Sequence, residues 1–269
     1  MKVPLTGGSG NLGQTLVPKL LDEGDTPVIL DVRAPPHLNR GAEFIEGSVL
    51  DRSKLAGIFR GCDCIVHIAA WHGIHEDRGE KDAYDFFDLN VRGTFEVFEA
   101  AASAGVGKVI FISTTSVYRP DTRYGSSKVL AELIAEDYRK HRLINIVTLR
   151  PRGFIPYWDR SVYAKYSDWA RWFWKGAVHI DDVATAVILS LDLLSDASST
   201  SSSSSPSTAP TNTPTPSRSL GCRGTGLDLP EILSRISRSG AFLRSRPGIK
   251  ANQARYFRDD SLAGLQAGL

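Results

Sequence analysis

The segment Thr6-Gly7-Gly8-Ser9-Gly10-Asn11-Leu12-Gly13 follows a short apolar run and opens a helix-forming stretch. Glycine suits three of these positions: Gly7 permits a tight turn, Gly10 lets the backbone approach a bound group, and Gly13 lets the helix pack against the strand. The first N–H groups of a helix lack backbone partners and lie at the positive end of its dipole, so they bind anions such as a pyrophosphate. The pattern predicts a dinucleotide-binding unit; the alternative is an ordinary tight turn between a strand and a helix.

An acidic residue at the end of the second expected strand indicates which dinucleotide would bind. Asp31 comes 18 residues after Gly13. A carboxylate at this place accepts hydrogen bonds from the adenosine ribose and repels a 2′-phosphate, which favours NAD over NADP. Arg33 could instead pair with that phosphate, so NADP is the less favoured alternative. Asp31 could also be a simple turn residue at the strand end.

Short β-branched runs alternate with segments of helical periodicity between Lys2 and Arg150. Helices are expected over Tyr84–Ala104, which Gly105 ends, and over Tyr124–Arg142. Such alternation is typical of an α/β protein with a Rossmann doubly wound parallel sheet. The six expected strands are Val3–Thr6, Pro27–Asp31, Glu43–Glu46, Cys64–Ala69, Lys108–Ser113 and Asn145–Leu149.

Whole-chain composition excludes several classes of protein. The 269 residues are 42% hydrophobic, enough for a core, and their formal charge of +2 indicates no general affinity for nucleic acid. The first ten residues lack the apolar region of a secretory signal, and no run approaches the length of a membrane span, so a cytoplasmic protein is expected. Three cysteines without metal-site spacing, and histidines at 67, 72 and 75 without completing ligands, lead us to expect no bound metal.

A tyrosine and a lysine stand four residues apart at the start of the second long helix. Tyr124 and Lys128 therefore share one helix face. A nearby ammonium stabilises phenolate and lowers the pKa of tyrosine, which makes the phenol a usable acid or base near neutral pH. The fifth strand ends in Ser113 and Thr114, which brings hydroxyl groups to the carboxyl edge of the sheet, where ligands bind.

Together these segments make the chain resemble the extended short-chain dehydrogenase/reductase superfamily, specifically its NAD-dependent epimerase/dehydratase branch. The resemblance covers about residues 1–194. It also rests on four further segments, which are His67-Ile68-Ala69-Ala70, Leu89 to Thr94, Leu149-Arg150-Pro151 and Val178 to Val183.

The resemblance implies oxidoreductase or isomerase chemistry on a sugar or nucleotide-sugar, with NAD as cofactor. Tyr124 would exchange a proton with a substrate oxygen, Thr114 would hydrogen-bond that oxygen, and Lys128 would hold the nicotinamide ribose and tune Tyr124. A homodimer is left open. The residues implied to bind the cofactor are Gly7, Gly10, Asn11, Leu12, Gly13, Asp31, Ser48, Val49, Ala69, Ala70, Asn90, Tyr124 and Lys128. For Asn90 the alternative is a polar helix residue that faces solvent.

Four departures from the family pattern favour a second hypothesis, an NAD-binding protein with weak or lost catalysis, either a regulatory or a truncated relative. Pro4 stands in the middle of the first strand, where it cannot donate to the sheet. Ser48 replaces the usual aspartate near the adenine. Only Arg119–Arg123 separates Tyr118 from Tyr124, and about thirty residues separate Arg150 from His179.

Composition divides the chain into four parts. Residues 1–150 are expected to form the NAD-binding domain, and residues 151–194 a remnant of a substrate lobe with the last elements of the sheet. Residues 195–219 are rich in Ser, Thr and Pro with no large apolar side chain, which predicts a disordered linker. Residues 220–269 carry a net charge of +4 and form either a solvated surface, a phosphate contact or part of the substrate lobe.

Aromatic residues are concentrated between Tyr157 and Trp174. Rings interspersed with cations suit sugar stacking, a partner surface or a membrane interface. The simpler alternative is a covering helix whose rings close the core.

Overall fold

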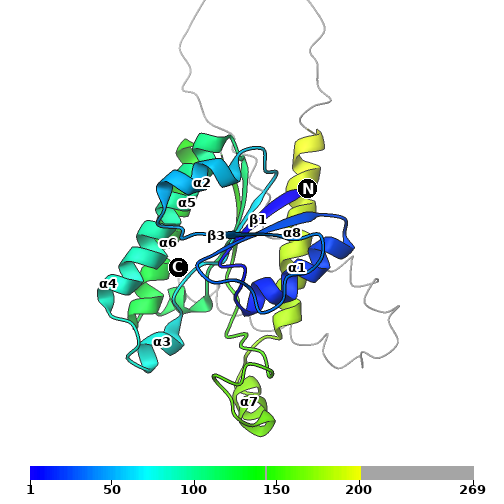
Figure 1. The fold of residues 1–269 in the computed structure, drawn as a ribbon. Helices are drawn as coiled ribbons and strands as arrows, with labels where there is room; N and C mark the ends of the chain where they lie inside the picture. The colour runs from blue at the N-terminus through cyan, green and yellow to red at the C-terminus, as the bar shows by residue number, and fades with distance from the viewer. Residues whose placement is uncertain (143, 201–269) are drawn as a thin grey trace, which may run out of the picture. The chain divides into compact units, whose positions relative to one another are not determined.

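The computed structural model describes residues 1–142 and 144–200, which form a parallel sheet between two layers of helices (Figure 1). The strand order is β3-β2-β1-β4-β5-β6, with all neighbours parallel. This order is that of a doubly wound dinucleotide-binding sheet and confirms the predicted fold class. The strands are β1 Lys2–Thr6, β2 Thr26–Asp31, β3 Glu43–Glu46, β4 Ile65–His67, β5 Lys108–Ile112 and β6 Asn145–Leu149.

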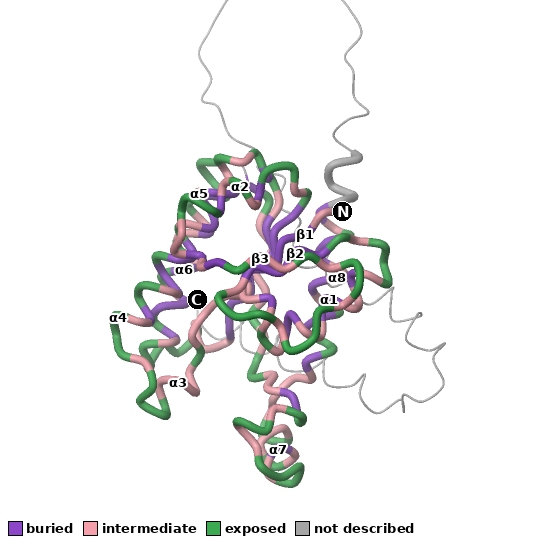
Figure 2. Tube along the Cα trace, viewed as in Figure 1, coloured by how far each residue is buried: buried purple, intermediate pink, exposed green. Residues whose placement is uncertain are grey.

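Two hydrophobic cores lie on opposite faces of the sheet. Helices α1 (Asn11–Asp22) and α8 (Ile180–Thr200) cover one face, and α2 (Arg52–Phe59), α5 (Gly93–Ala104) and α6 (Arg123–His141) cover the other (Figure 1). Within β5, Ile110 and Ile112 join the first core while Val109 and Phe111 join the second, as the two-residue period of a strand requires. Figure 2 shows the buried positions along the strands and the inner sides of these helices.

The long helix expected over residues 84–104 is present but not uniform. It consists of α4 (Ala83–Phe86), a π-helical segment (Phe87–Arg92) and α5. Gly105 ends it with a φ of 75°, a left-handed conformation that glycine adopts without strain. A π-helical turn inside a helix is frequently associated with a functional site, and this one contains Asn90.

Pro4 is accommodated on one side of β1. Strand β1 pairs with β2 over Lys2–Thr6 but with β4 only at Leu5 and Thr6. The carbonyls of Lys2 and Thr6 accept hydrogen bonds from Asp63 and Ile68, so the even-numbered backbone groups face β4. The missing N–H of Pro4 therefore falls beside the start of β4, where the ladder is short.

Residues 151–194 contribute helices and no strand, so the expectation that they supply the last elements of the sheet is wrong. They contain α7 (Tyr166–Phe173) and most of α8. A linker was expected to begin at residue 195, but helix α8 continues to Thr200, so residues 195–200 are helical. The remainder of that expected linker and residues 220–269 lie outside the described residues.

The aromatic segment packs largely against itself. Trp169 is buried, and its ring centroid lies 4.9 Å from that of Phe173 and 5.8 Å from that of Tyr157. The indole N–H of Trp169 donates to the Ile155 carbonyl at 2.8 Å. Trp174 is 83% exposed, so part of this segment faces solvent. Neither of the two cores includes a ring of this segment, so the interpretation of a covering helix whose rings close the core is not supported.

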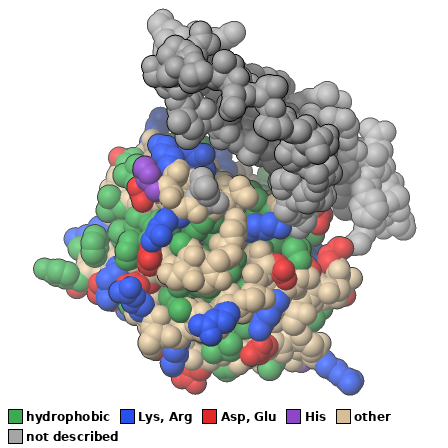
Figure 3. All heavy atoms as spheres, turned by 90° about the horizontal axis from the view of Figure 1, so that it is seen from above, with side chains coloured by type: hydrophobic (Ala, Val, Ile, Leu, Met, Phe, Trp, Pro, Cys, Tyr) green, Lys and Arg blue, Asp and Glu red, His purple; other side chains and the backbone are tan. Residues whose placement is uncertain are grey.

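Charged side chains of both signs share the surface. On the face drawn in Figure 3, Lys and Arg side chains are interspersed with Asp and Glu side chains. None of the helices in the described part of the chain is long and apolar enough to cross a membrane.

Candidate active site

The glycine turn between β1 and α1 leaves no room for side chains at Gly7, Gly8 and Gly13. Gly7 has a φ of 69°, and a Cβ atom there would lie 2.7 Å from the Cα atom of Ala69. A Cβ atom at Gly13 would lie 2.1 Å from the carbonyl oxygen of Gly8. The turn therefore brings the backbones after β1 and β4 together, with Ala69 beside Gly7. This close cradle fits the pyrophosphate of a dinucleotide.

Asp31 is linked directly to the glycine turn. Its Oδ2 atom accepts a hydrogen bond from the Ser9 N–H at 3.1 Å, and its Oδ1 atom accepts one from the Arg33 N–H at 3.2 Å. The Ser9 hydroxyl donates to the Arg33 carbonyl at 2.7 Å. Asp31 thus lies at the carboxyl end of β2 and faces the turn, where a ribose would meet it.

Ser48 and Val49 follow β3. The Ser48 hydroxyl accepts a hydrogen bond from the Leu50 N–H at 3.1 Å, which shapes the turn before α2. Val49 is 4% exposed and belongs to the core, and its contact with the cofactor stays a prediction. Ala70 is half-buried in the loop after β4.

Asn90 is fully buried, so the alternative that it faces solvent is wrong. Its side-chain oxygen accepts from the Trp71 N–H at 2.8 Å, and its amide nitrogen donates to the Trp71 carbonyl at 2.9 Å. The same nitrogen donates to the Ser127 hydroxyl at 2.9 Å. Asn90 therefore joins the loop after β4 to α6, which carries Tyr124 and Lys128.

A buried hydrogen-bonded row connects the glycine turn to Asn90. His67 Nδ1 lies 2.7 Å from the Thr6 hydroxyl, and His67 Nε2 lies 3.0 Å from the Thr94 hydroxyl. Thr94 donates its own proton to the Asn90 carbonyl, so it must accept from His67 Nε2–H. Burial, aided by the charge of Lys128, lowers the pKa of His67 to about 3. His67 is therefore a neutral structural link.

The structure pairs Tyr124 with Thr114 and places Lys128 one turn further along α6. Lys128 Nζ donates to the Ile112 carbonyl at 2.8 Å and lies 4.3 Å from the centroid of the Phe111 ring. Burial lowers the pKa of Lys128 to about 7, against a smaller opposing effect of Glu132. Lysine here is thus close to losing its charge at neutral pH.

The pKa of Tyr124 differs from the sequence-based expectation. Burial raises the pKa of the phenol, and a hydrogen bond with the Thr114 side chain opposes that rise. The lowered pKa expected from Lys128 is therefore not found, because desolvation of the phenolate outweighs the stabilising contacts of the described residues. The Tyr124–Thr114 pairing itself is present.

The Glu132 carboxylate, which no sequence pattern singled out, fixes α6 to the sheet. Glu132 accepts hydrogen bonds from the Arg150 guanidinium at 2.6, 2.9 and 3.2 Å and from the Ser113 hydroxyl at 2.5 Å. Ser113 follows β5 and Arg150 follows β6, so one carboxylate ties three elements together. Its position four residues after Lys128 was the only signal in the sequence.

The start of α6 is capped by a second acidic residue that the sequence did not reveal. Glu76 of α3 (Gly73–Asp77) accepts hydrogen bonds from the N–H groups of Arg123 and Tyr124 at 2.9 and 3.0 Å. The Thr122 hydroxyl accepts from the Gly125 N–H at 3.0 Å. These contacts satisfy N–H groups at the helix start and orient the backbone that carries Tyr124.

Asn11, expected beside the cofactor, uses its side chain to bind the chain itself. Its Nδ2 atom donates to Asp159 Oδ2 at 2.7 Å, although the two residues are 148 positions apart. Leu12 is buried in the core between α1 and the sheet. Asp159 is a further residue of this site that no sequence pattern indicated.

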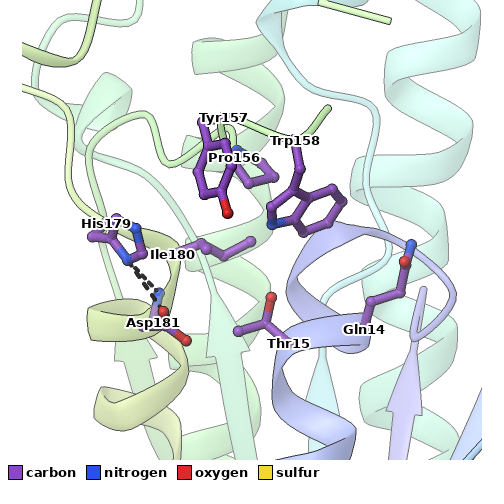
Figure 4. A pocket seen from close by; sticks show the side chains of 8 residues that line it. All are labelled: Gln14, Thr15, Pro156, Tyr157, Trp158, His179, Ile180 and Asp181. Carbon is purple, nitrogen blue, oxygen red and sulfur yellow. Dashed lines mark hydrogen bonds and ion pairs between the residues drawn. The ribbon is translucent and has the colours of Figure 1, made fainter. Parts of the chain in front are cut away.

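Two cavities of similar size lie beside the site. One, of about 390 Å³, is lined by Gln14, Thr15, Pro156, Tyr157, Trp158, His179, Ile180 and Asp181 (Figure 4). The other, of about 410 Å³, lies along α6 and β6 and includes Tyr118, Glu132 and Arg150. Tyr124 lines neither of these two cavities. Within residues 1–142 and 144–200, no three His, Cys, Asp or Glu side chains are grouped so as to hold a metal ion.

Comparison with curated proteins gives relatives that act on nucleotide-sugars. The chain is 31% identical to UDP-glucose 4-epimerase of Erwinia amylovora over 167 residues, which are 52% of this chain and 49% of the relative. It is 34% identical to UDP-glucose 4-epimerase of Neisseria meningitidis serogroup C over 166 residues, 52% of this chain and 48% of the relative. The chain thus spans about half the length of the curated relatives it matches.

Solved structures and a family model agree with this similarity. A double mutant of dTDP-glucose 4,6-dehydratase DesIV from Streptomyces venezuelae, solved with NAD bound, matches with a TM-score of 0.62 and 26% identity, covering 71% of this chain and 72% of that one. Residues 3–155, more than half of the chain, match the family model described as NAD dependent epimerase/dehydratase family. The chain therefore belongs to the NAD-dependent epimerase/dehydratase family, whose cofactor is NAD.

Proposed function

We propose that this protein is an NAD-dependent epimerase, dehydratase or dehydrogenase that acts on a hydroxyl-bearing carbon of a sugar or nucleotide-sugar. The observation that carries the proposal is the hydrogen-bonded pair of Tyr124 and Thr114, with Lys128 one helical turn further along α6. The family and the named activities of its relatives support the choice of substrate class.

Two of the three side chains would act on one substrate oxygen, and the third would bind the cofactor. Tyr124 exchanges a proton with that oxygen, and Thr114, in hydrogen-bonding reach of the phenol, orients it. Lys128 is a neighbouring cation whose charge depends on pH near 7 and which would hold the nicotinamide ribose. NAD, when bound, supplies the hydride acceptor, while the protein positions the reacting carbon.

The proposal is tested with the purified full chain, NAD, and a panel of uronic acids and UDP-sugars. Absorbance at 340 nm detects net oxidation, and analysis of the sugars detects epimerisation or dehydration. Tyr124→Phe should abolish turnover while NAD binding, measured by calorimetry, stays nearly intact. Tyr84→Phe is the matched control, because Tyr84 is 82% exposed on α4, and it should turn over normally. Parallel loss of turnover and NAD binding in Tyr124→Phe would show that the phenol is structural.

A second candidate is an NAD-binding protein with weak or lost catalysis. The raised pKa of Tyr124 favours it, because less of the phenol is then ionised near neutral pH. NAD binding without any Tyr124-dependent reaction across the substrate panel would support this candidate over the first.

A homodimer is part of the proposal. Phe95 on α5 and Leu133 on α6 are 43% and 62% exposed, so these two helices present apolar side chains outward. Light scattering of the purified chain measures the mass, and a monomer at working concentrations would contradict the dimer.

A further inference from the structure

A tight turn after β6 fixes the orientation of the Asp159 carboxylate. We call residues 156–163 the Asp159 turn. The Asp159 N–H donates to the Pro156 carbonyl at 3.1 Å, and the Asp159 carbonyl accepts from the N–H groups of Val162 and Tyr163 at 3.3 and 3.2 Å. Asp159 Oδ1 accepts from the N–H and the hydroxyl of Ser161 at 3.1 and 2.6 Å. Hydrogen bonds within the turn therefore hold Oδ1 and leave Oδ2 available for a contact outside the turn.

Contacts with two distant elements place this turn. Asp159 Oδ2 accepts from Asn11 Nδ2 at 2.7 Å, and Arg78 donates to the Ser161 carbonyl at 2.7 Å. His72 lies close enough for its charge to interact with Asp159, although burial dominates and lowers the pKa of His72 to about 4. Asn11 follows β1 and His72 follows β4, and these strands are neighbours in the sheet. The Asp159 turn therefore bridges the loops that follow the two strands.

The bridged loops flank the place where this fold binds anions. From β1 the chain proceeds to β2 and β3 on one side, and β4 pairs with the other side of β1, so the strand order reverses here. Gly10 precedes α1 without a side-chain cap, and the first turn of α1 contains no acidic residue. The Asp31 carboxylate bonds the Ser9 N–H just before Gly10, and Asp159 brings a second carboxylate to the side chain of Asn11 from 148 residues away.

The other side of the Asp159 turn borders open space. Tyr157 and Trp158 line the cavity of about 390 Å³ together with residues of α1 and α8, as Figure 4 shows. Tyr157 and Trp158 are 45% and 39% exposed. The turn therefore borders open space, although the rings of Tyr157 and Tyr163 also pack against Trp169 and Trp172 of α7, with centroids 5.8 and 5.4 Å apart.

We propose that Asp159 is an internal competitor of the cofactor. Its carboxylate, held by the side chain of the first residue of α1, lies beside the anion position and opposes the binding of the NAD pyrophosphate there, because two anions at one helix start repel each other. This inference rests on the NAD site of the proposed function and adds a residue that sets the affinity of that site.

Calorimetry with NAD tests the proposal on the full chain. Asp159→Asn keeps the size of the side chain and removes its charge, and Asp159→Ala removes both. Both variants should bind NAD about threefold to tenfold more tightly, because neither carries a negative charge beside the pyrophosphate. Asp168→Asn is the matched control, since Asp168 lies in the nearby α7 and pairs with Arg171 at 3.6 Å. Its affinity for NAD should equal that of the unaltered chain.

Adenosine separates competition at the anion position from a general opening of the site. Adenosine carries no phosphate, so its affinity should be the same for the unaltered chain and for Asp159→Asn. Unchanged or weakened NAD binding by both Asp159 variants would overturn the proposal, and so would an equal gain for adenosine and NAD. Turnover that depends on Tyr124 tests the proposed function separately, because calorimetry of cofactor binding does not require a reaction.

Discussion

At the scale of single residues, burial controls the two ionisable groups of the site more strongly than their mutual proximity. Lys128 is 2% exposed, and Tyr124 is half-buried beside Thr114. Desolvation disfavours both the ammonium and the phenolate, so it lowers the pKa of Lys128 and raises that of Tyr124. A useful acid or base at this site therefore depends on contacts made by the bound ligands as well as on the spacing of the two residues.

The lowered pKa of Lys128 predicts a specific dependence of stability on pH. Its pKa falls from 10.5 to about 7 on folding, so between these values the unfolded chain holds a proton that the folded chain lacks. Because folding releases this proton, the free energy of unfolding rises as pH increases from about 7 to about 10. Lys128→Met removes this contribution, so its Tm relative to the unaltered chain should decline by roughly 10 °C over that interval.

Circular dichroism melting curves at several pH values measure this difference. Lys140→Met on the same helix is the control, because Lys140 is 57% exposed. Its Tm should follow that of the unaltered chain in parallel. A Lys128→Met curve that also runs parallel would show that the folded chain keeps Lys128 charged.

Asp31 is predicted to select NAD over NADP. Asp31→Ala removes the carboxylate that accepts the Ser9 N–H and would meet the adenosine ribose. We expect calorimetry to show a larger loss of affinity for NAD, about tenfold, than for NADP, which the carboxylate no longer repels. Asp22→Ala at the exposed end of α1 is the control. A greater loss for NADP would reverse the assignment.

At the scale of elements, the chain joins its helices and strands through a few polar contacts between segments far apart in sequence. The Glu132 carboxylate ties α6 to the ends of β5 and β6, Glu76 caps α6 from α3, and Asn90 joins α6 to the loop after β4. Buried and partly buried polar groups of this kind need specific partners, because an unpaired one destabilises the fold. They fix where Tyr124 and Lys128 lie.

Pro4 is predicted to weaken β1. It removes a possible ladder hydrogen bond toward β4, although it also restricts the unfolded chain. Pro4→Val should raise the free energy of unfolding by about 1 kcal/mol and Tm by about 2–4 °C. Scanning calorimetry measures the shift, with Pro36→Val in an exposed loop as the control. An unchanged Tm would mean that the edge of the ladder tolerates proline without loss.

At the scale of the whole molecule, ligand binding and folding are coupled. A ligand that binds only the folded chain raises the free energy of unfolding by about 2.7 kcal/mol at a concentration of 100 times Kd. NAD at that concentration should therefore raise Tm by about 5–10 °C, and NADP at the same concentration should raise it less. Thermal melting followed by fluorescence measures both shifts. Equal shifts would contradict the preference assigned to Asp31.

Much of the fold was predictable because its signals are local. The six strands were expected within a few residues of their observed bounds, since β-branched runs separated by helical periods need no distant information. The helix over residues 84–104 was expected, but its π-helical segment was not. The sheet was wrongly expected to receive elements from residues 151–194, because a family pattern was carried onto a segment that contains α7 and the start of α8.

The parallel sheet, the glycine turn and the Tyr124–Lys128 helix face could be predicted from local sequence patterns. Each depends on sterics or periodicity within a few residues, as the 2.1 Å approach at Gly13 illustrates. Only the tertiary structure decided the burial that shifts the pKa values of Tyr124 and Lys128, and the Asn11–Asp159 contact across 148 residues. Desolvation and long-range hydrogen bonds depend on which segments the topology brings together, and no local pattern records that.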